Sequence, residues 1–93
     1  MKSYESLRKE HEKLRQEVVD NLDFLMGSVS TKGPKRPGLN LTFKMNQVTR
    51  TRHIRKELEA RVSQMTARWR RLRVLLRKLS DANWERLNRG IDE

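Results

Sequence analysis

The chain has 93 residues, a formal net charge of +10, no cysteine, and a composition that is 34% hydrophobic and 37% charged. This length and lean hydrophobic content predict a single domain, with long exposed helices or with a core that is shared in an oligomer. The lack of cysteine excludes disulfides and thiolate metal sites. No stretch approaches the roughly 18 apolar residues of a membrane span, and the first residues lack the apolar core of a signal peptide. We therefore expect a soluble, cytoplasmic protein with no membrane partner.

The positive charge is concentrated in the middle of the chain. Residues 27–80 hold fifteen Lys and Arg but only two Asp or Glu, a balance of +13, whereas residues 1–26 and 81–93 have balances of −1 and −2. A face that is merely solvated normally mixes both signs. A dense block of one sign is more typical of a surface that binds a polyanion, so it favours nucleic acid as the partner.

Residues 3–26 are predicted to form the first helix, because apolar residues recur there at heptad spacing. His11 and Asn21 place polar side chains in this seam, where they could fix the register of a helix pair. The alternative that His11 binds a metal is disfavoured, since the chain has only two His and no Cys. The apolar seam residues of this helix are Leu7, Leu14, Val18 and Leu25.

Residues 27–38 are predicted to be a basic loop. They contain three of the four glycines and both prolines, and their only charged residues are Lys32, Lys35 and Arg36. The spacing of a nucleotide-binding P-loop is missing. Two interpretations stay open, a flexible connector and a basic loop that becomes ordered on a nucleic-acid backbone.

Residues 39–54 are predicted to form a β-hairpin, since apolar and polar residues alternate on both sides of Asn46-Gln47. A two-residue turn there would pair Met45 with Val48 and Leu39 with Ile54. The second strand leads into the densest basic patch, residues 49–56, whose Arg and Thr side chains can donate to phosphates. A solvated edge strand is the alternative interpretation of this patch. The cations of the hairpin and patch are Lys44, Arg50, Arg52, Arg55 and Lys56.

Residues 55–90 are predicted to form a long helix, with a kink near residues 80–83 as an open alternative. Its heptad seam favours a core position for Trp69 over base stacking. Arg61 and Arg68 flank the seam, where they could pair with Glu10 or Glu17 of an antiparallel first helix. The seam consists of Leu58, Val62, Met65, Trp69, Leu72, Leu76 and Leu79, and the cations assigned to the outer face are Arg70, Arg71, Arg73, Arg77 and Lys78.

Three short motifs give the chain a family resemblance. They are Gly27-Ser28-Val29-Ser30, Thr49-Arg50-Thr51-Arg52-His53-Ile54 and Leu79-Ser80-Asp81-Ala82-Asn83. With them the chain resembles a family of small bacterial proteins of unknown function that are often encoded near insertion-sequence transposases. Many of those relatives carry a Cys-rich insert after the Gly-Ser-x-Ser loop. This chain has residues 31–37 there instead, so a metal role does not transfer. The resemblance implies no catalytic residues and favours work on DNA beside mobile-element machinery.

These patterns together predict an α+β fold with two long helices, forming an antiparallel helical hairpin or coiled coil, and an intervening β-hairpin. We expect a homo-oligomer, because one small chain cannot hide all its apolar faces. The predicted function is non-enzymatic nucleic-acid binding, with DNA favoured over RNA and no cofactor or metal. No residues combine a nucleophile with a base and an orienting group. The alternative is a basic coiled-coil adaptor, or a subunit of a larger assembly, that docks on an acidic protein partner.

Overall fold

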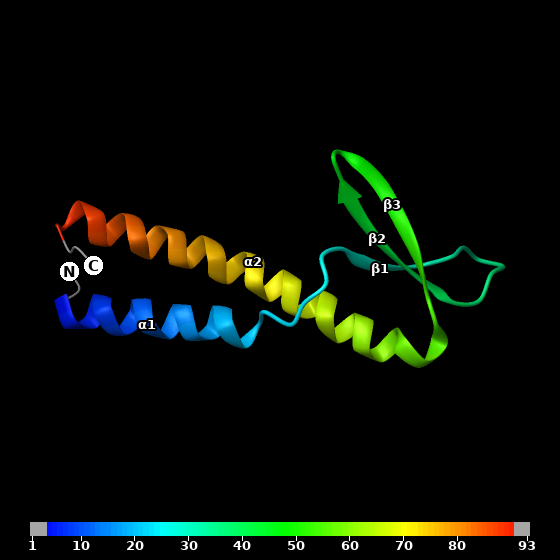
Figure 1. Ribbon diagram of the computed structural model, residues 1–93, viewed down its shortest axis with the longest axis horizontal. Helices are drawn as coiled ribbons and strands as arrows, with labels where there is room; N and C mark the ends of the chain where they lie inside the picture. The colour runs from blue at the N-terminus through cyan, green and yellow to red at the C-terminus, as the bar shows by residue number, and fades with distance from the viewer. Residues whose placement is uncertain (1–3, 91–93) are drawn as a thin grey trace. The chain divides into compact units, whose positions relative to one another are not determined.

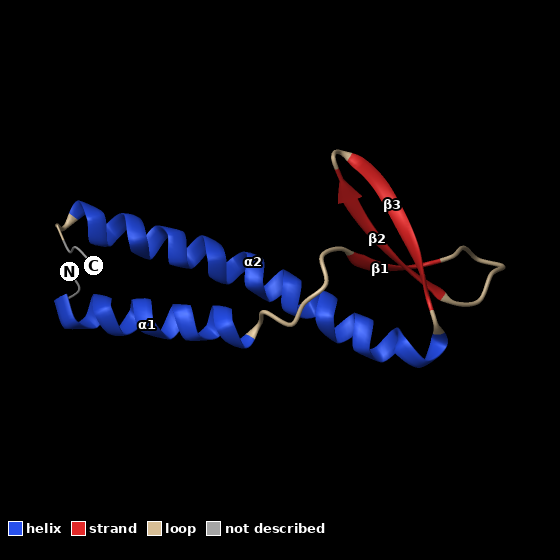
Figure 2. Ribbon diagram, viewed as in Figure 1, coloured by secondary structure: helices blue, strands red, loops and turns tan. Residues whose placement is uncertain are grey.

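The computed structural model describes residues 4–90 of the chain. Along the sequence, helix α1 (Tyr4–Asp20) precedes strands β1 (Ser28–Thr31), β2 (Leu39–Met45) and β3 (Val48–Ile54), and a short 3-10 helix η1 (Lys56–Leu58) leads into α2 (Glu59–Asn88). The fold is α+β, with two helices and one antiparallel sheet of strand order β1-β2-β3 (Figures 1 and 2).

The chain divides into two compact units. We call residues 23–70 the sheet unit, because they hold all three strands and the first part of α2. We call the described residues 4–22 and 71–90 the helix-pair unit, because they hold α1 and the remainder of α2.

The predicted fold of a helical hairpin with an intervening β-hairpin is wrong. Three strands follow α1, because residues 28–31 of the predicted loop form β1 and pair with β2 from Ser28–Thr42 to Thr31–Leu39. A two-stranded hairpin is marginal in water, and this third strand pairs the backbone groups along the free edge of β2. Helix α1 also ends at Asp20, several residues before its predicted end.

The register of β2 and β3 is the predicted one. Met45 pairs with Val48 and Leu39 with Ile54, across the two-residue turn Asn46-Gln47. Both turn residues have positive φ, 51° and 66°, as a type I′ turn requires. Since side chains alternate along a strand, the sheet has two faces of different character. The apolar face carries Val29, Leu39, Leu41, Phe43, Met45, Val48 and Ile54 together with Thr31, Arg50 and Arg52, and the polar face carries Ser28, Ser30, Asn40, Thr42, Lys44, Thr49, Thr51 and His53.

The segment between α1 and β1 contacts α2 within the sheet unit. The Phe24 ring stacks on Trp69 with 5.2 Å between ring centroids, and the Leu25 amide donates to the Met65 carbonyl at 3.2 Å. Gly27 then brings the backbone close to β2, where a Cβ would lie 2.6 Å from the Thr42 carbonyl oxygen. Within the sheet unit, the first half of α2 therefore packs on the segment before β1.

In the helix-pair unit, α1 lies beside the second half of α2 and runs in the opposite direction (Figure 1). Glu17 accepts from Arg71 Nη2 at 2.9 Å, and His11 Nε2 lies 2.7 Å from Asn83 Oδ1. The polar seam residue His11 thus contacts polar partners on α2. Helix α2 is continuous through residues 80–83, where the sequence left a kink open.

The buried positions of α2 depart from the predicted heptad. Thr66, which the heptad leaves out, is 1% exposed. Leu72 and Leu75 are buried, at 2% and 1% exposure, whereas the predicted Leu76 is 44% exposed. The second half of α2 packs in the unit that contains α1, whereas its first half packs on the segment before β1, so the two halves bury different faces of the helix. Leu58 is also 39% exposed, because it belongs to η1 and precedes α2. The next core residue after Leu72 is therefore Leu75, which the heptad pattern did not include.

Replacing Leu75 and Leu76 separately by Ala tests this corrected seam. We expect Leu75→Ala to lower the free energy of unfolding by about 2–5 kcal/mol, since it leaves a cavity in the core. Leu76→Ala, at an exposed position, should cost less than about 1 kcal/mol. Urea denaturation of both variants measures the difference. Equal losses, or a larger loss at Leu76, would show that the heptad is the true contact face.

Candidate nucleic-acid interface

The strands belong to a segment that contains no acidic residue. Residues 24–56 hold eight Lys and Arg and no Asp or Glu. The whole sheet unit has eleven basic and three acidic residues, a balance of +8. A concentration of one sign on so small a unit gives a strongly positive surface potential.

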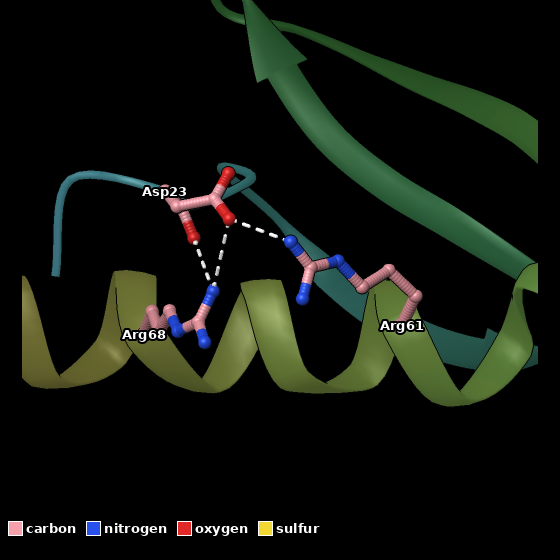
Figure 3. A network of polar contacts seen from close by, with 3 residues as sticks. All are labelled: Asp23, Arg61 and Arg68. Carbon is pink, nitrogen blue, oxygen red and sulfur yellow. Dashed lines mark hydrogen bonds and ion pairs between the residues drawn. The ribbon is translucent and has the colours of Figure 1, made fainter.

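Asp23, the first acid of the sheet unit, is engaged by two arginines of α2 (Figure 3). Arg61 Nη2 lies 2.6 Å from Asp23 Oδ2, and Arg68 Nη1 lies 3.2 Å from the same oxygen. Arg68 Nη1 also donates to the Asp23 backbone carbonyl at 3.2 Å. The predicted pairing of these arginines with Glu10 or Glu17 is therefore wrong. Asp23 ties the segment before β1 to α2 and neutralises none of the cations on the strands.

The two arginines of β3 lie on the apolar face of the sheet. Arg50 pairs across the strands with Phe43, and Arg52 pairs with Leu41. The Arg52 guanidinium carbon lies 4.9 Å from the centre of the Phe43 ring, in the geometry of a cation–π contact. Such a contact uses the flat face of the guanidinium and leaves its in-plane N–H groups available to an anion. Both arginines are exposed, and no carboxylate of the described residues pairs with either.

The opposite face of the sheet offers hydroxyl groups beside cations. Ser30 Oγ lies 3.1 Å from Thr42 Oγ1, and Lys32 Nζ forms a hydrogen bond with His53 Nδ1. Hydroxyl, ammonium and guanidinium groups are the donors that proteins use to position phosphates. His53 and the hydroxyls of β1 are not among the residues that the sequence predicted for the site. Ser28 and Ser30 alternate around Val29, but a run this short does not by itself predict a strand.

The thirteen cations predicted to bind nucleic acid do not form one site. Four belong to the helix-pair unit, where Arg71 pairs with Glu17 and Arg77 lies 3.7 Å from Asp81. Of the nine in the sheet unit, Arg55 lies 4.0 Å from Glu57. The other eight have no carboxylate partner among residues 4–90, and they are Lys32, Lys35, Arg36, Lys44, Arg50, Arg52, Lys56 and Arg70. We call these eight together the cationic surface, which includes both faces of the sheet, with Lys44 on the polar face and Arg50 and Arg52 on the apolar face.

Residues 4–90 contain no group of three or more His, Cys, Asp or Glu side chains that could hold a metal ion. Neither helix within that range has the length and apolar content needed to cross a bilayer. Comparisons with protein-family models, with curated proteins and with solved structures find no match. The site is therefore interpreted from its own chemistry.

Replacing Asp23 by Asn tests the role of its two ion pairs. The change keeps the shape of the side chain but removes its charge, so we expect a loss of about 1 kcal/mol in the free energy of unfolding, typical of two exposed ion pairs. The loss should shrink in 1 M salt, where exposed charges are screened. Glu12→Gln, an exposed acid of α1, is the matched control and should have little effect. A loss that is independent of salt, or equal in the control, would contradict this role.

Proposed function

We propose that this chain is a non-enzymatic nucleic-acid-binding protein whose cationic surface binds duplex DNA. The observation that carries the proposal is the absence of any acid from residues 24–56, which leaves the cations of the sheet without carboxylate partners. The groups that this surface presents are cations and hydroxyls, which bind phosphates and do not form an acid–base pair. The resemblance to proteins encoded near transposases points in the same direction.

Strand geometry gives the arginines a spacing that suits a phosphate backbone. Arg50 and Arg52 lie two residues apart on one face of β3, which separates their positions by about 6.8 Å. This is about twice the 3.4 Å axial rise per phosphate of one DNA strand. Phosphate contacts position a protein on the duplex without selecting a sequence. We therefore propose binding that tolerates many sequences.

The hairpin favours DNA over RNA as the partner. A two-stranded ribbon can enter a groove of B-form DNA, whereas the major groove of A-form RNA is too deep and narrow for side chains to read. Exposed strand residues at the turn between β2 and β3 are available for such an approach.

The dependence of affinity on salt tests the proposal. If six to eight phosphates are neutralised, log affinity should fall with log salt at a slope of roughly −5 to −7. Arg50→Ala with Arg52→Ala should weaken binding and flatten the slope by about two units, about one per lost contact. Fluorescence anisotropy with a labelled duplex at several salt concentrations measures both quantities.

Arg8→Ala with Arg15→Ala is the matched control, since it removes two exposed cations from α1. This variant changes the net charge by the same amount but should leave the slope nearly unchanged. A wild-type slope near zero would contradict the proposal. If the two double variants change the salt slope equally, the hairpin is not part of the DNA-binding surface.

An acidic protein is the second candidate partner, because it would satisfy the same cations. Poly-glutamate, at the same concentration of negative charge as duplex DNA, separates the two candidates in a competition assay. If DNA is the partner, its spacing and grooves should make it the stronger competitor. If poly-glutamate competes equally well, the adaptor function is favoured.

Exposed apolar side chains on α2 support a homo-oligomer. Leu76, Trp84 and Leu87 lie on one side of the helix and are 44%, 64% and 68% exposed. The described residues 4–22 have a charge balance of −1, and residues 71–90 have one of +4, so two copies can place helices of opposite charge together. We propose a second copy of the chain as the partner of this stripe.

Sedimentation velocity tests the oligomer. We expect a dimer at micromolar concentration, and we expect Trp84→Ser with Leu87→Ser to weaken it at least about tenfold, because central aromatic and aliphatic contacts dominate interface energies. Val74→Ser is the control, since Val74 is 48% exposed on another side of α2. A wild-type monomer throughout this range, or equal weakening by the control, would contradict the proposed interface.

A further inference from the structure

The hairpin between β2 and β3 carries an exposed apolar pair at its tip. Met45 and Val48 pair directly beside the turn and are 45% and 53% exposed. On the same face, further from the turn, Leu41 and Ile54 are 8% and 4% exposed. The apolar face of the hairpin is therefore buried in the sheet unit near its base and open to solvent at its tip.

The surroundings of this pair restrict what can cover it. Lys44 neighbours Met45 in β2, and Arg50 is the next residue after Val48 on the same face of β3. No acidic residue occurs anywhere in residues 24–56. The matching surface must therefore be apolar at its centre and negative at its margins. Duplex DNA has this arrangement, because stacked bases lie between two rows of phosphates.

The backbone of the tip is narrow. Asn46 and Gln47, with φ values of 51° and 66°, close the strands with only two residues. The two strands are about 4.8 Å apart there, so the end of the ribbon is a single pair of residues wide. Behind the tip, the Arg52 guanidinium covers the Phe43 ring at 4.9 Å and braces the two strands against each other. A narrow, braced ribbon with apolar side chains at its end can act as a wedge.

We propose that Met45 and Val48 form a wedge that enters the minor groove of duplex DNA and partly unstacks one base step. Arg50 and Arg52 would contact the phosphates on the margins, and the duplex would bend away from the wedge. Proteins that insert Met and other apolar side chains into the minor groove kink DNA in this way. This inference rests on the proposed function and adds the class of DNA that is preferred.

The wedge predicts a preference for deformable DNA. Unstacking costs least at flexible pyrimidine–purine steps and at mismatches or nicks. A duplex that contains such a site should therefore bind more tightly than an intact duplex of the same length and charge. Phosphate contacts alone would give equal affinities.

The experiment uses the full chain and two 25-base-pair duplexes, one intact and one with a central mismatch, each with a donor and an acceptor dye at its ends. For the wild type, we expect energy transfer to increase on binding and the mismatched duplex to bind about tenfold more tightly. Met45→Thr with Val48→Thr places β-branched residues, which favour strands, at both positions and leaves all the cations in place. This variant should keep the salt slope but lose both the bend and the preference.

Val19→Ser with Leu22→Ser is the matched control, since it removes two exposed apolar side chains, 58% and 55% exposed, that are not part of the hairpin. It should bend DNA as the wild type does. Circular dichroism and thermal unfolding establish whether the double threonine variant is folded. If it is unfolded, the single variant Val48→Thr replaces it and should give a preference for the mismatched duplex that lies between that of the wild type and equal binding of the two duplexes.

The outcomes separate the wedge from the proposed function. A steep salt slope without bending or preference in the wild type overturns the wedge and leaves the DNA-binding function standing. Retained bending and preference in the folded threonine variant, or tighter binding to single-stranded DNA than to either duplex, also overturns the wedge. A lack of salt-dependent binding to every DNA overturns the proposed function itself.

Discussion

The structure depends on how the 30-residue helix α2 divides its apolar surface between two sets of neighbours. Its second half buries Leu72 and Leu75 in the unit that contains α1. Its first half holds the segment that leads into the sheet, through the stacking of Trp69 on Phe24 and the hydrogen bond from Leu25 to Met65. One helix therefore supplies part of the core of both units, and neither unit needs a large core of its own.

The same division separates the charges. Five of the described acids lie in residues 4–22, where Glu17 neutralises Arg71. The sheet unit has only three acids, and Asp23 is engaged by Arg61 and Arg68. Arginines on the helix are thus partly neutralised by carboxylates, whereas those on the strands are not. This difference distinguishes structural cations from cations that are available to an external anion.

The β2–β3 hairpin combines the features on which our functional proposals rest. Strand alternation places Arg50 and Arg52 on the same face as Met45 and Val48, and the tight turn brings the apolar pair to the end of the ribbon. The acid-free segment keeps this end positive. A polyanion with an apolar interior satisfies both properties at once, which neither a purely acidic nor a purely apolar protein surface does.

The sequence by itself determined the elements with strong local signals. Alternation and the two-residue Asn46-Gln47 connection predicted the register of β2 and β3, since a one-residue slip would expose Leu41 and Ile54. Only the tertiary structure decided the rest. β1 has four residues and becomes a strand because β2 offers it a free edge, so local pattern could not predict it. Leu75 replaced Leu76 in the core because the second half of α2 packs in the unit of α1 and buries a different face from the first half. Asp23 took the arginines expected to pair with the first helix, because ion pairs depend on which segments the fold brings within a few ångströms of each other.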